Sequence, residues 1–303
     1  MNTARTTAVI VSYRSRDTIA DTMIAAREAH ESGMLECVVV DNCGSDGTAE
    51  YLEKEHAWAE LLPSPENLGF GRACNLGFRR VTTEYVLLLN PDAVLPAASL
   101  EVMIRFLDEH PRAGIIGPAI REPDEGLQHA GGLPTPLRLI LEAAGANESL
   151  GRRPIVPGGA AFRTDWLCGA ILLFRKRLLD ELNGFDPRFF LYFEETDLCL
   201  RAQQRDWELW AVGEAVGWHR NAASAGTGDE RMLYSCIAEY YFRSRFYYLV
   251  KHHGWVLAIA TEITEVAVLG MRCAWRRLRG RPQNEFRERL RAPILKLPPE
   301  PGR

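Results

Sequence analysis

The stretch LECVVVDNCGSDGTAEYLEKEH (residues 35–56) decides the fold class. Its first seven residues are nearly all apolar, which is typical of a strand that is covered on both faces in a parallel sheet. Residues 45–56 open with Ser and Asp, which favour helix N-termini, and continue as a helical pattern. A buried strand followed by a helix is the repeating unit of α/β proteins. The stretch therefore predicts a mainly parallel sheet flanked by crossover helices.

The same alternation continues on both sides of this stretch. Further strands are predicted at residues 7–13, 59–63, 84–90 and 113–118, and further helices at 17–32, 97–110 and 196–204. The glycine-punctuated segment 66–80 is predicted to be a turn that leads into another helix. Residues 166–179 are expected to pass from a strand into a helix.

The chain divides by composition into three parts. Residues 1–225 hold the strand and helix alternation, interrupted at 121–163 by a segment rich in Gly and Pro that predicts a mobile excursion over the sheet. Residues 226–275 are predicted to be a C-terminal helical layer, because aromatic and aliphatic residues recur there at helical spacing. Residues 276–303 form a basic tail, with nine Lys or Arg against three Glu, that we expect to be flexible.

Bulk composition narrows the class of partner and compartment. The 303 residues are 47% hydrophobic and 25% charged, which is ordinary for a globular protein, and the net charge of -4 gives no reason to expect nucleic acid. The seven cysteines include no C-x-x-C pair, so reduced thiols in the cytoplasm are expected. We expect no signal peptide, and the apolar segment 255–270 is short for a bilayer crossing and carries two glutamates.

Polar residues follow three of the predicted strands. These strand-end groups are Ser12, Tyr13 and Arg14, then Asp41 and Asn42, then Asn90, Pro91 and Asp92. Ligands of open parallel sheets bind at the carboxyl ends of the strands, so these side chains are expected to meet at one edge. Each group could also have a purely structural role, because sequences of this kind, rich in Asn and Asp, are favourable in turns and helix caps. A Mg²⁺ site is the sharper interpretation, since one carboxylate plus substrate phosphates and water suffices for Mg²⁺.

The sequence GFGRAC (residues 69–74) superficially suggests a dinucleotide-binding oxidoreductase. The glycine fingerprint of that class belongs between the first strand and the first helix, where the pyrophosphate meets a helix N-terminus. Here the first turn, SYRSRD, contains no glycine. Nicotinamide or flavin binding is therefore the weaker alternative.

The sequence FFLYFEETDL (residues 189–198) places three carboxylates directly after an aromatic run. Glu194, Glu195 and Asp197 would lie at the start of a helix, where the macrodipole favours their ionised forms. Acids are common in first helical turns, so simple helix capping is the bland alternative.

Seven blocks of sequence, in order and spacing, resemble the inverting nucleotide-sugar glycosyltransferases of family 2, and most of all their rhamnosyltransferase-like branch. The resemblance covers about residues 5–225 and rests on VIVSY, VVVDNCGSDGT, ENLGFGRACNLG, LLLNPDA, WLCGAILLFRK, GFDPRFFLYFEETDLCLR and VGWHRNAASAG. It implies a GT-A (nucleotide-diphospho-sugar transferase) fold with a C-terminal helical extension. A non-catalytic nucleotide-sugar-binding homologue is the alternative in another functional class.

The resemblance also implies roles for single residues at the donor site. Ser12, Tyr13 and Asp41 would hold the nucleoside, and Asn67, Gly69 and Asn75 would lie near the nucleotide and its ribose. The metal-binding D-x-D position falls on Asn90-Pro91-Asp92, with an amide in place of the first carboxylate. His219 would complete a Mg²⁺ or Mn²⁺ site, although a lone histidine near tryptophans is more often structural. Trp166, Gly169 and Ala170 would shape the donor pocket, and Trp166 is equally a candidate core residue.

Glu195 occupies the position of the family's catalytic base, where Asp is more usual, and Glu194 and Asp197 would support it. The implied donor is a dTDP- or UDP-sugar, with dTDP-rhamnose first, and the implied acceptor is a glycan or lipid-linked hydroxyl. The amphipathic 255–270 segment and the basic tail together suggest a membrane surface as a further partner, which would place the enzyme at the inner face of the membrane.

Overall fold

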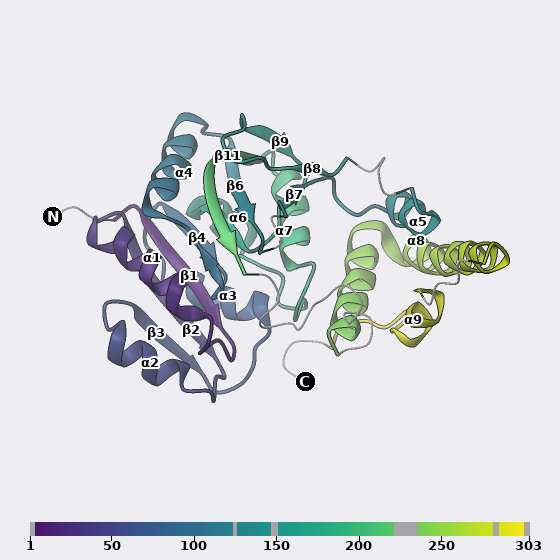
Figure 1. Ribbon diagram of the computed structural model, residues 1–303, viewed down its shortest axis with the longest axis horizontal. Coiled ribbons are helices and arrows are strands. Elements are labelled where there is room, and N and C mark those ends of the chain that lie inside the picture. The colour runs from purple at the N-terminus through teal and green to yellow at the C-terminus, as the bar shows by residue number, and fades with distance from the viewer. Residues whose placement is uncertain (1–3, 124–125, 147–150, 221–235, 281–284, 300–303) are drawn as a thin grey trace.

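The computed structural model describes residues 4–123, 126–146, 151–220, 236–280 and 285–299. An α/β sheet domain occupies one side of the molecule, and a group of C-terminal helices lies beside it (Figure 1). The sheet domain comes from the first part of the chain, as the strand and helix alternation predicts.

One half of the main sheet is parallel. Its strands are β1 (Thr6–Ser12), β2 (Leu35–Asn42), β3 (Glu60–Ser64) and β4 (Tyr85–Leu89), in the spatial order β3-β2-β1-β4. All seven residues of β1 are buried, as expected for a strand covered on both faces. The register places Ser12 opposite Asp41, so the polar ends of β1 and β2 lie side by side.

The other half of the sheet is mixed rather than parallel. β10 (Ile171–Arg175) runs antiparallel to both β4 and β6 (Ala113–Arg121), and β11 (Glu208–His219) runs parallel to β6. The short strands β5 (Ala93–Val94) and β9 (Phe162–Thr164) pair with β11 in the antiparallel sense. β10 therefore brings the residues before it to the edge where the parallel strands end.

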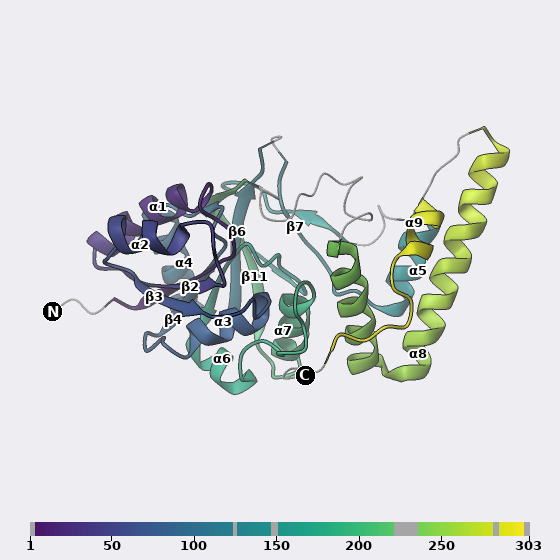
Figure 2. The ribbon, with the colours of Figure 1, turned by 90° about the horizontal axis from the view of Figure 1, so that it is seen from below.

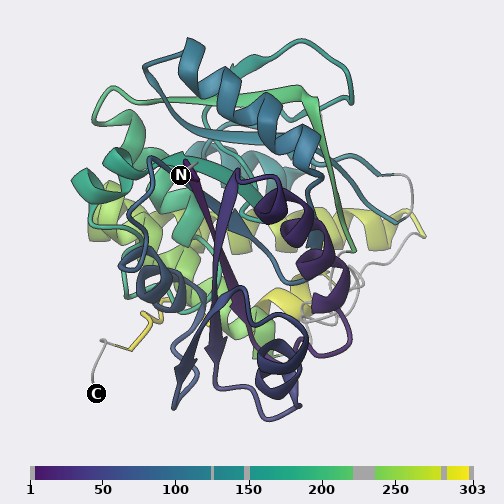
Figure 3. The same ribbon diagram turned by 90° about the vertical axis from the view of Figure 1, so that its left-hand side faces the viewer.

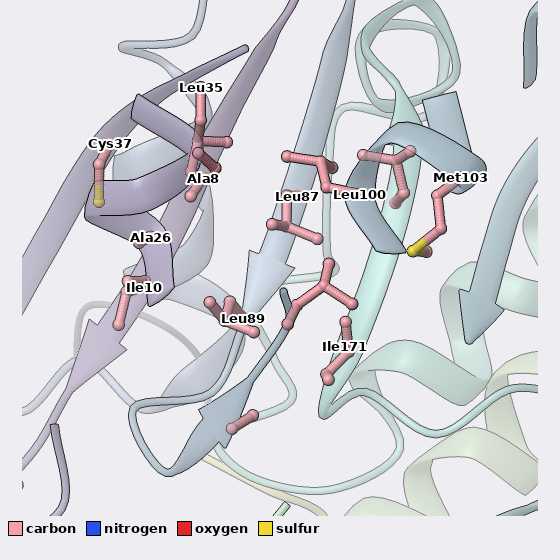
Figure 4. Packing of buried hydrophobic residues seen from close by; sticks show 14 of the residues in the cluster. Ala8, Ile10, Ala26, Leu35, Cys37, Leu87, Leu89, Leu100, Met103 and Ile171 are labelled. Atoms are coloured by element: carbon pink, nitrogen blue, oxygen red, sulfur yellow. The ribbon is translucent and has the colours of Figure 1, made fainter. Parts of the chain in front are cut away.

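Helices cover both faces of the sheet (Figure 3). One face packs against α1 (Ile19–Glu31), α2 (Thr48–Glu55) and α4 (Ala97–Glu109), and the other against α3 (Phe70–Phe78), α6 (Lys176–Leu182) and α7 (Glu194–Gln203). Successive side chains of β1 and β4 alternate between the two cores. Figure 4 shows the first core, where Ile10 and Leu89 from the strands lie among side chains of α1 and α4.

Two segments differ from the sequence-based expectation. Residues 66–80 were expected to be a turn that leads into another helix, but the helix α3 already begins at Phe70, because its glycines are sites of close packing rather than helix breaks. A Cβ on Gly77 would lie 2.4 Å from Val9 Cγ1. The expected excursion at 121–163 contains β7 (His129–Ala130), α5 (Pro136–Ala144) and β8 (Arg153–Pro154). Thr135 caps α5, since its hydroxyl accepts a hydrogen bond from the Arg138 N–H.

The C-terminal helices form a separate layer beside α5 (Figure 2). α8 (Cys236–Leu278) is broken at Gly254, whose φ of 79° is left-handed, so that its two halves run in different directions. The basic tail predicted at 276–303 contains a folded helix, α9 (Glu285–Arg291), whose Arg289 is buried and pairs with Glu262 of α8. Opposite charges in the two segments explain why these tail residues fold back.

α8 is also longer and more apolar than the short segment 255–270 suggests. Its residues Ala238–Leu278 have a mean hydropathy of 1.5 over their most apolar stretch, and they are long and apolar enough to cross a membrane by length and composition alone. Only 17% of that stretch is buried inside the molecule.

Candidate functional site

The ends of β1 and β2 form the first wall of the site. Ser12 is buried, and its hydroxyl has no hydrogen-bond partner among the described residues. Asp41 is also buried, and its Oδ1 accepts a hydrogen bond of 2.9 Å from the Gly44 N–H. Burial raises the pKa of Asp41 despite that hydrogen bond. Tyr13 follows β1 with 37% of its surface exposed, and the Arg14 guanidinium lies over its ring, 5.4 Å from the ring centre.

Asn42 organises the loop before α3, a role that sequence analysis did not assign. Its Oδ1 accepts from the Leu68 N–H at 2.8 Å, and its Nδ2 donates to Asn67 Oδ1 at 3.0 Å. Asn67 Oδ1 in turn accepts from the Gly69 N–H at 2.9 Å. The two amides together hold the loop against the end of β2. The available signal was the position of Asn42, directly after Asp41 at a strand end.

Gly69 and Asn75 join α3 to the segment that leads to the carboxylates. Gly69 has a φ of 76°, and a Cβ there would lie only 2.4 Å from the Phe190 carbonyl oxygen. The next residue, Phe70, donates its N–H to that oxygen at 2.7 Å. Asn75 was expected beside the nucleotide, but both ends of its amide bond the backbone of Phe185, at 2.7 and 2.9 Å. The Asn75 side chain therefore links α3 to the segment around Phe185.

Asp92 and His219 meet where β5 pairs with β11. His219 lies opposite Ala93 in that register, and its Nε2 is 3.1 Å from Asp92 Oδ1 and 3.4 Å from Asn90 Nδ2. His219 Nδ1 is buried and has no hydrogen-bond partner among the described residues. The described residues contain no cluster of three or more His, Cys, Asp or Glu side chains that could hold a metal ion. Among the described residues, Asp92 and His219 could both ligate a cation here, and phosphate and water oxygens would complete its shell.

The start of α7 has an unusual backbone. Tyr192 and Phe193 both have a φ of 68°, a left-handed conformation that is uncommon for bulky residues and typical of functional sites. This turn brings Glu194 inward, where it is 4% exposed and its Oε2 has no partner among the described residues. Burial, and then the charge of Glu195, raise the pKa of Glu194 well above its usual value.

Glu195 lies at the same edge of the sheet as Asp92. A Cβ on Gly169 would be 3.6 Å from Glu195 Cγ, and the neighbouring Ala170 accepts the Asn90 N–H at 2.9 Å. We expected the helix macrodipole to favour the ionised form of Glu195. Burial has the larger effect and raises the pKa of Glu195 to about 7, while backbone N–H groups at the start of α7 oppose the rise.

Asp197 and Trp166 support this turn of α7 from two sides. Asp197 is fully buried and is paired with Arg201 at 2.7 Å, His252 at 2.7 Å and Lys251 at 2.6 Å. Burial alone would raise the pKa of Asp197, but the His252 hydrogen bond and the two cations outweigh burial and lower the pKa. Trp166 is half-buried and donates its indole N–H to Thr196 Oγ1 at 3.0 Å. Both contacts orient the helix that carries Glu195.

The chain matches known proteins at the levels of sequence and fold. The profile described as "Glycosyl transferase family 2" matches residues 7–168, which is more than half of the chain. An N-acetylglucosaminyl-diphospho-decaprenol L-rhamnosyltransferase of Mycobacterium tuberculosis is 28% identical over 72% of this chain and 76% of its own. The rhamnosyltransferase WbbL of Escherichia coli is 24% identical over 60% of this chain and 70% of its own.

A solved structure has a similar fold. The mannosyltransferase PcManGT of Pyrobaculum calidifontis, in complex with GDP-Man and Mn²⁺, superposes with a TM-score of 0.59 and 16% identity. The superposition covers 95% of this chain and 79% of that one. The mixed sheet with helices on both faces is therefore the GT-A arrangement, and the dinucleotide-dependent oxidoreductase alternative is set aside. The chain belongs to glycosyltransferase family 2, in its rhamnosyltransferase-like branch, and is an enzyme that uses a nucleotide-sugar donor.

Proposed function

We propose that this enzyme transfers a sugar with inversion, L-rhamnose from dTDP-rhamnose in the first instance, to a hydroxyl of a glycan or lipid-linked acceptor. One observation carries the proposal. Glu195 packs against Gly169, and the hydrogen bond from the Asn90 N–H to the Ala170 carbonyl ties that segment to the strand end that bears Asp92. A carboxylate that titrates near neutral pH thus faces the edge where a nucleoside diphosphate would lie.

The donor nucleoside would lie over the ends of β1 and β2. The free hydroxyl of Ser12 could donate or accept a hydrogen bond there, and the carboxyl of Asp41 could accept one. The exposed ring of Tyr13 offers a stacking surface. Asn67 and Gly69, fixed by Asn42, would line the ribose side. Trp166, Gly169 and Ala170 would border the sugar, where the two small residues allow close approach.

Asp92 and His219 would hold Mg²⁺ or Mn²⁺ together with the donor diphosphate. The bound cation would neutralise negative charge on the departing nucleoside diphosphate. A pair of protein ligands with open positions suits a cation that arrives with its phosphate ligands. The amide at Asn90, in place of a second carboxylate, predicts weak binding of the cation without nucleotide.

Glu195 would act as the general base. Its carboxylate accepts the proton of the acceptor hydroxyl while that oxygen forms a bond to the anomeric carbon. The bond between the anomeric carbon and the diphosphate oxygen breaks on the opposite side, so the configuration inverts. Glu194 and Asp197 would support this step, since Glu194 lines the buried side of the same turn and Asp197 anchors α7 through Arg201, Lys251 and His252.

One of the relatives and the apolar helix α8 support the proposed acceptor and location. The Mycobacterium tuberculosis relative is named for a lipid-diphosphate-linked acceptor. A similar acceptor would place this enzyme in the cytoplasm at the inner face of the membrane.

Product release from a panel of dTDP-, UDP- and GDP-sugars, with and without Mn²⁺, tests the proposal. We expect nucleotide release with a dTDP- or UDP-sugar that depends on Mn²⁺ and falls about a hundredfold or more in Glu195→Gln, because the base is lost. Glu208→Gln is the matched control, because Glu208 lies at the opposite end of β11 from His219, and this variant should retain activity. Unchanged activity in Glu195→Gln would remove Glu195 as the base. Nucleotide binding without transfer to any acceptor would favour the non-catalytic homologue.

A further inference from the structure

The second half of α8, residues 255–278, presents an unbroken apolar stripe to the outside. Its members recur every three or four residues and thus share one helix face. The apolar stripe consists of Val256, Ala260, Ile263, Ala267, Met271, Ala274 and Leu278. The large members are well exposed, from 57% at Ile263 to 85% at Val256. Trp255 and Trp275 are also more than half exposed, beside the two ends of the stripe.

The charged residues in the middle of this helix, Glu262, Glu265 and Arg272, face the interior instead. Glu262 and Glu265 both pair with the buried Arg245 of the first half of α8. The distance is 2.7 Å for Glu262 and 2.5 Å for Glu265. Arg289 of α9 pairs with Glu262 from the other side. Arg272 donates to the Ala143 carbonyl of α5 at 2.9 Å. A surface helix of a water-soluble protein has the reverse pattern, so water is not the neighbour that this face suits.

We propose that the apolar stripe docks on the surface of a bilayer that contains anionic lipid. The exposed residues within 254–280 include no acid, whereas Arg277 and Arg279 are exposed at the C-terminal end of the stripe beside Arg276. Arginines next to an apolar helix face complement anionic headgroups. The two tryptophans lie about 30 Å apart along the helix, and indole rings suit the boundary between headgroups and acyl chains. A second copy of this chain that paired through the same face would cover the stripe, but the exposed residues within 254–280 of that copy include no acid to meet the arginines.

The helix lies on the membrane and does not cross it. Glu262, Glu265 and Arg272 sit in the middle of the helix and are bound to Arg245, α9 and α5. A crossing would carry these charges and their partners into hydrocarbon, which is costly. Figure 2 shows α5 and α9 along the inner side of this half of α8, while its outer side has no neighbouring element. That outer side therefore defines the docking face.

Docking on this face would also orient the active site. The first half of α8 holds α7 through the contacts of Lys251 and His252 with Asp197, two residues after Glu195. A membrane-bound α8 would thus keep the catalytic turn at a set position relative to the lipid surface. This consequence rests on the proposed function, whereas the docking face follows from α8 alone.

Flotation of the full chain with vesicles tests the docking face without any substrate. The probe is phosphatidylethanolamine vesicles with or without phosphatidylglycerol. We expect the protein to float with phosphatidylglycerol vesicles. Ile263→Glu/Met271→Glu should bind about tenfold or more weakly, because charges replace two apolar side chains that docking would bury in the lipid. Ile24→Glu is the matched control, since Ile24 is an isoleucine of similar exposure (54%) on α1, and it should bind like the unmodified protein.

The remaining arms test the charges and the mode of binding. Arg276→Ala/Arg277→Ala/Arg279→Ala should weaken binding to phosphatidylglycerol vesicles but leave residual binding to neutral ones unchanged. Equal melting temperatures of all variants by circular dichroism show that folding is intact. The proposal is overturned if Ile263→Glu/Met271→Glu floats like the unmodified protein, or if the protein resists extraction by alkaline carbonate as a spanning helix does. It is also overturned if the protein does not float with either kind of vesicle and instead forms a dimer that the same double substitution dissociates.

Discussion

His219 Nε2 lies 3.1 Å from Asp92 Oδ1, although 127 residues separate the two in the sequence. The pairing of β5 with β11 sets this contact, because His219 stands opposite Ala93 in the register. Both side chains are largely buried, and the imidazole keeps one nitrogen without a partner among the described residues. The contact thus joins the two proposed ligands of the cation before any donor arrives.

Asp92→Asn should weaken Mn²⁺-dependent binding of dTDP or UDP by about tenfold or more, because an amide is a poorer ligand for a hard cation. Calorimetric titration with and without Mn²⁺ measures this, and binding without metal should change little. Asp21→Asn is the control, since Asp21 is an exposed carboxylate that pairs with Arg220, beside His219. An equal loss of affinity in the two titrations would assign Asp92 to the nucleotide rather than to the cation.

Activity should rise with pH through the titration of Glu195. Burial raises the pKa of Glu195 to about 7, so at pH 6 most molecules hold a protonated carboxyl that is unable to accept a proton. We therefore expect kcat/KM to increase about tenfold per pH unit below 7 and to level off above it. The measurement is kcat/KM for transfer between pH 5 and 9. A profile that is already nearly level from about pH 5.5 upward, as for a glutamate with an ordinary pKa, would contradict the assignment.

Glu194→Gln should stabilise the fold, and more so at higher pH. The folded-state pKa of Glu194 lies well above its unfolded value, so the favourable contribution of the protonated carboxyl is complete below about pH 4.5 and is lost as pH rises toward the folded pKa. Glutamine removes the cost of an ionisable group there. Thermal unfolding of both proteins at pH 5 and pH 8 should show a larger increase in Tm at pH 8, and a decrease at both values would refute the argument.

Asp197→Asn should destabilise the protein strongly, because it leaves Arg201, Lys251 and His252 without their buried carboxylate. Removal of one partner from a buried ion pair costs about 3–5 kcal/mol. The loss should shrink at low pH, since the lowered pKa means that Asp197 contributes stability above its unfolded pKa and loses it as pH falls. Denaturant unfolding measures the change. Asp180→Asn, in an exposed pair with Lys176, should cost less than about 1 kcal/mol.

Gly69→Ala and Gly47→Ala separate two costs of a methyl group. Both glycines have positive φ, 76° and 81°. Alanine adds about 1–2 kcal/mol of backbone strain at Gly47, whose ψ of 11° is left-handed helical, and more at Gly69, whose ψ of 172° lies in a region that essentially only glycine populates. At Gly69 the new Cβ would also meet the Phe190 carbonyl oxygen at 2.4 Å, whereas nothing lies within 4 Å at Gly47. Gly69→Ala should therefore lose more free energy of unfolding and more nucleotide affinity. Equal losses would show that the contact with Phe190 has no energetic weight.

Local patterns were sufficient for much of the fold. The apolar run at 35–41 and the cap residues after it predicted β2 and α2, because period and end signals of such elements are local. The glycines of α3 misled the prediction, since their reason is close packing on Val9, a residue far away in sequence. The antiparallel insertion of β10 was equally invisible, because strand direction depends on partners and not on the strand itself.

Sequence patterns alone identified which residues could do chemistry: the polar residues at the ends of β1, β2 and β4, and the three acids in the first turn of α7. Only the tertiary structure decided their roles. It turned Asn75 to the Phe185 backbone, joined Asp92 to His219, and surrounded Glu195 with protein so that desolvation raises its pKa to about 7. The physical reason is that hydrogen-bond partners and desolvation are properties of neighbours in space, and residues up to 127 positions apart supply them here.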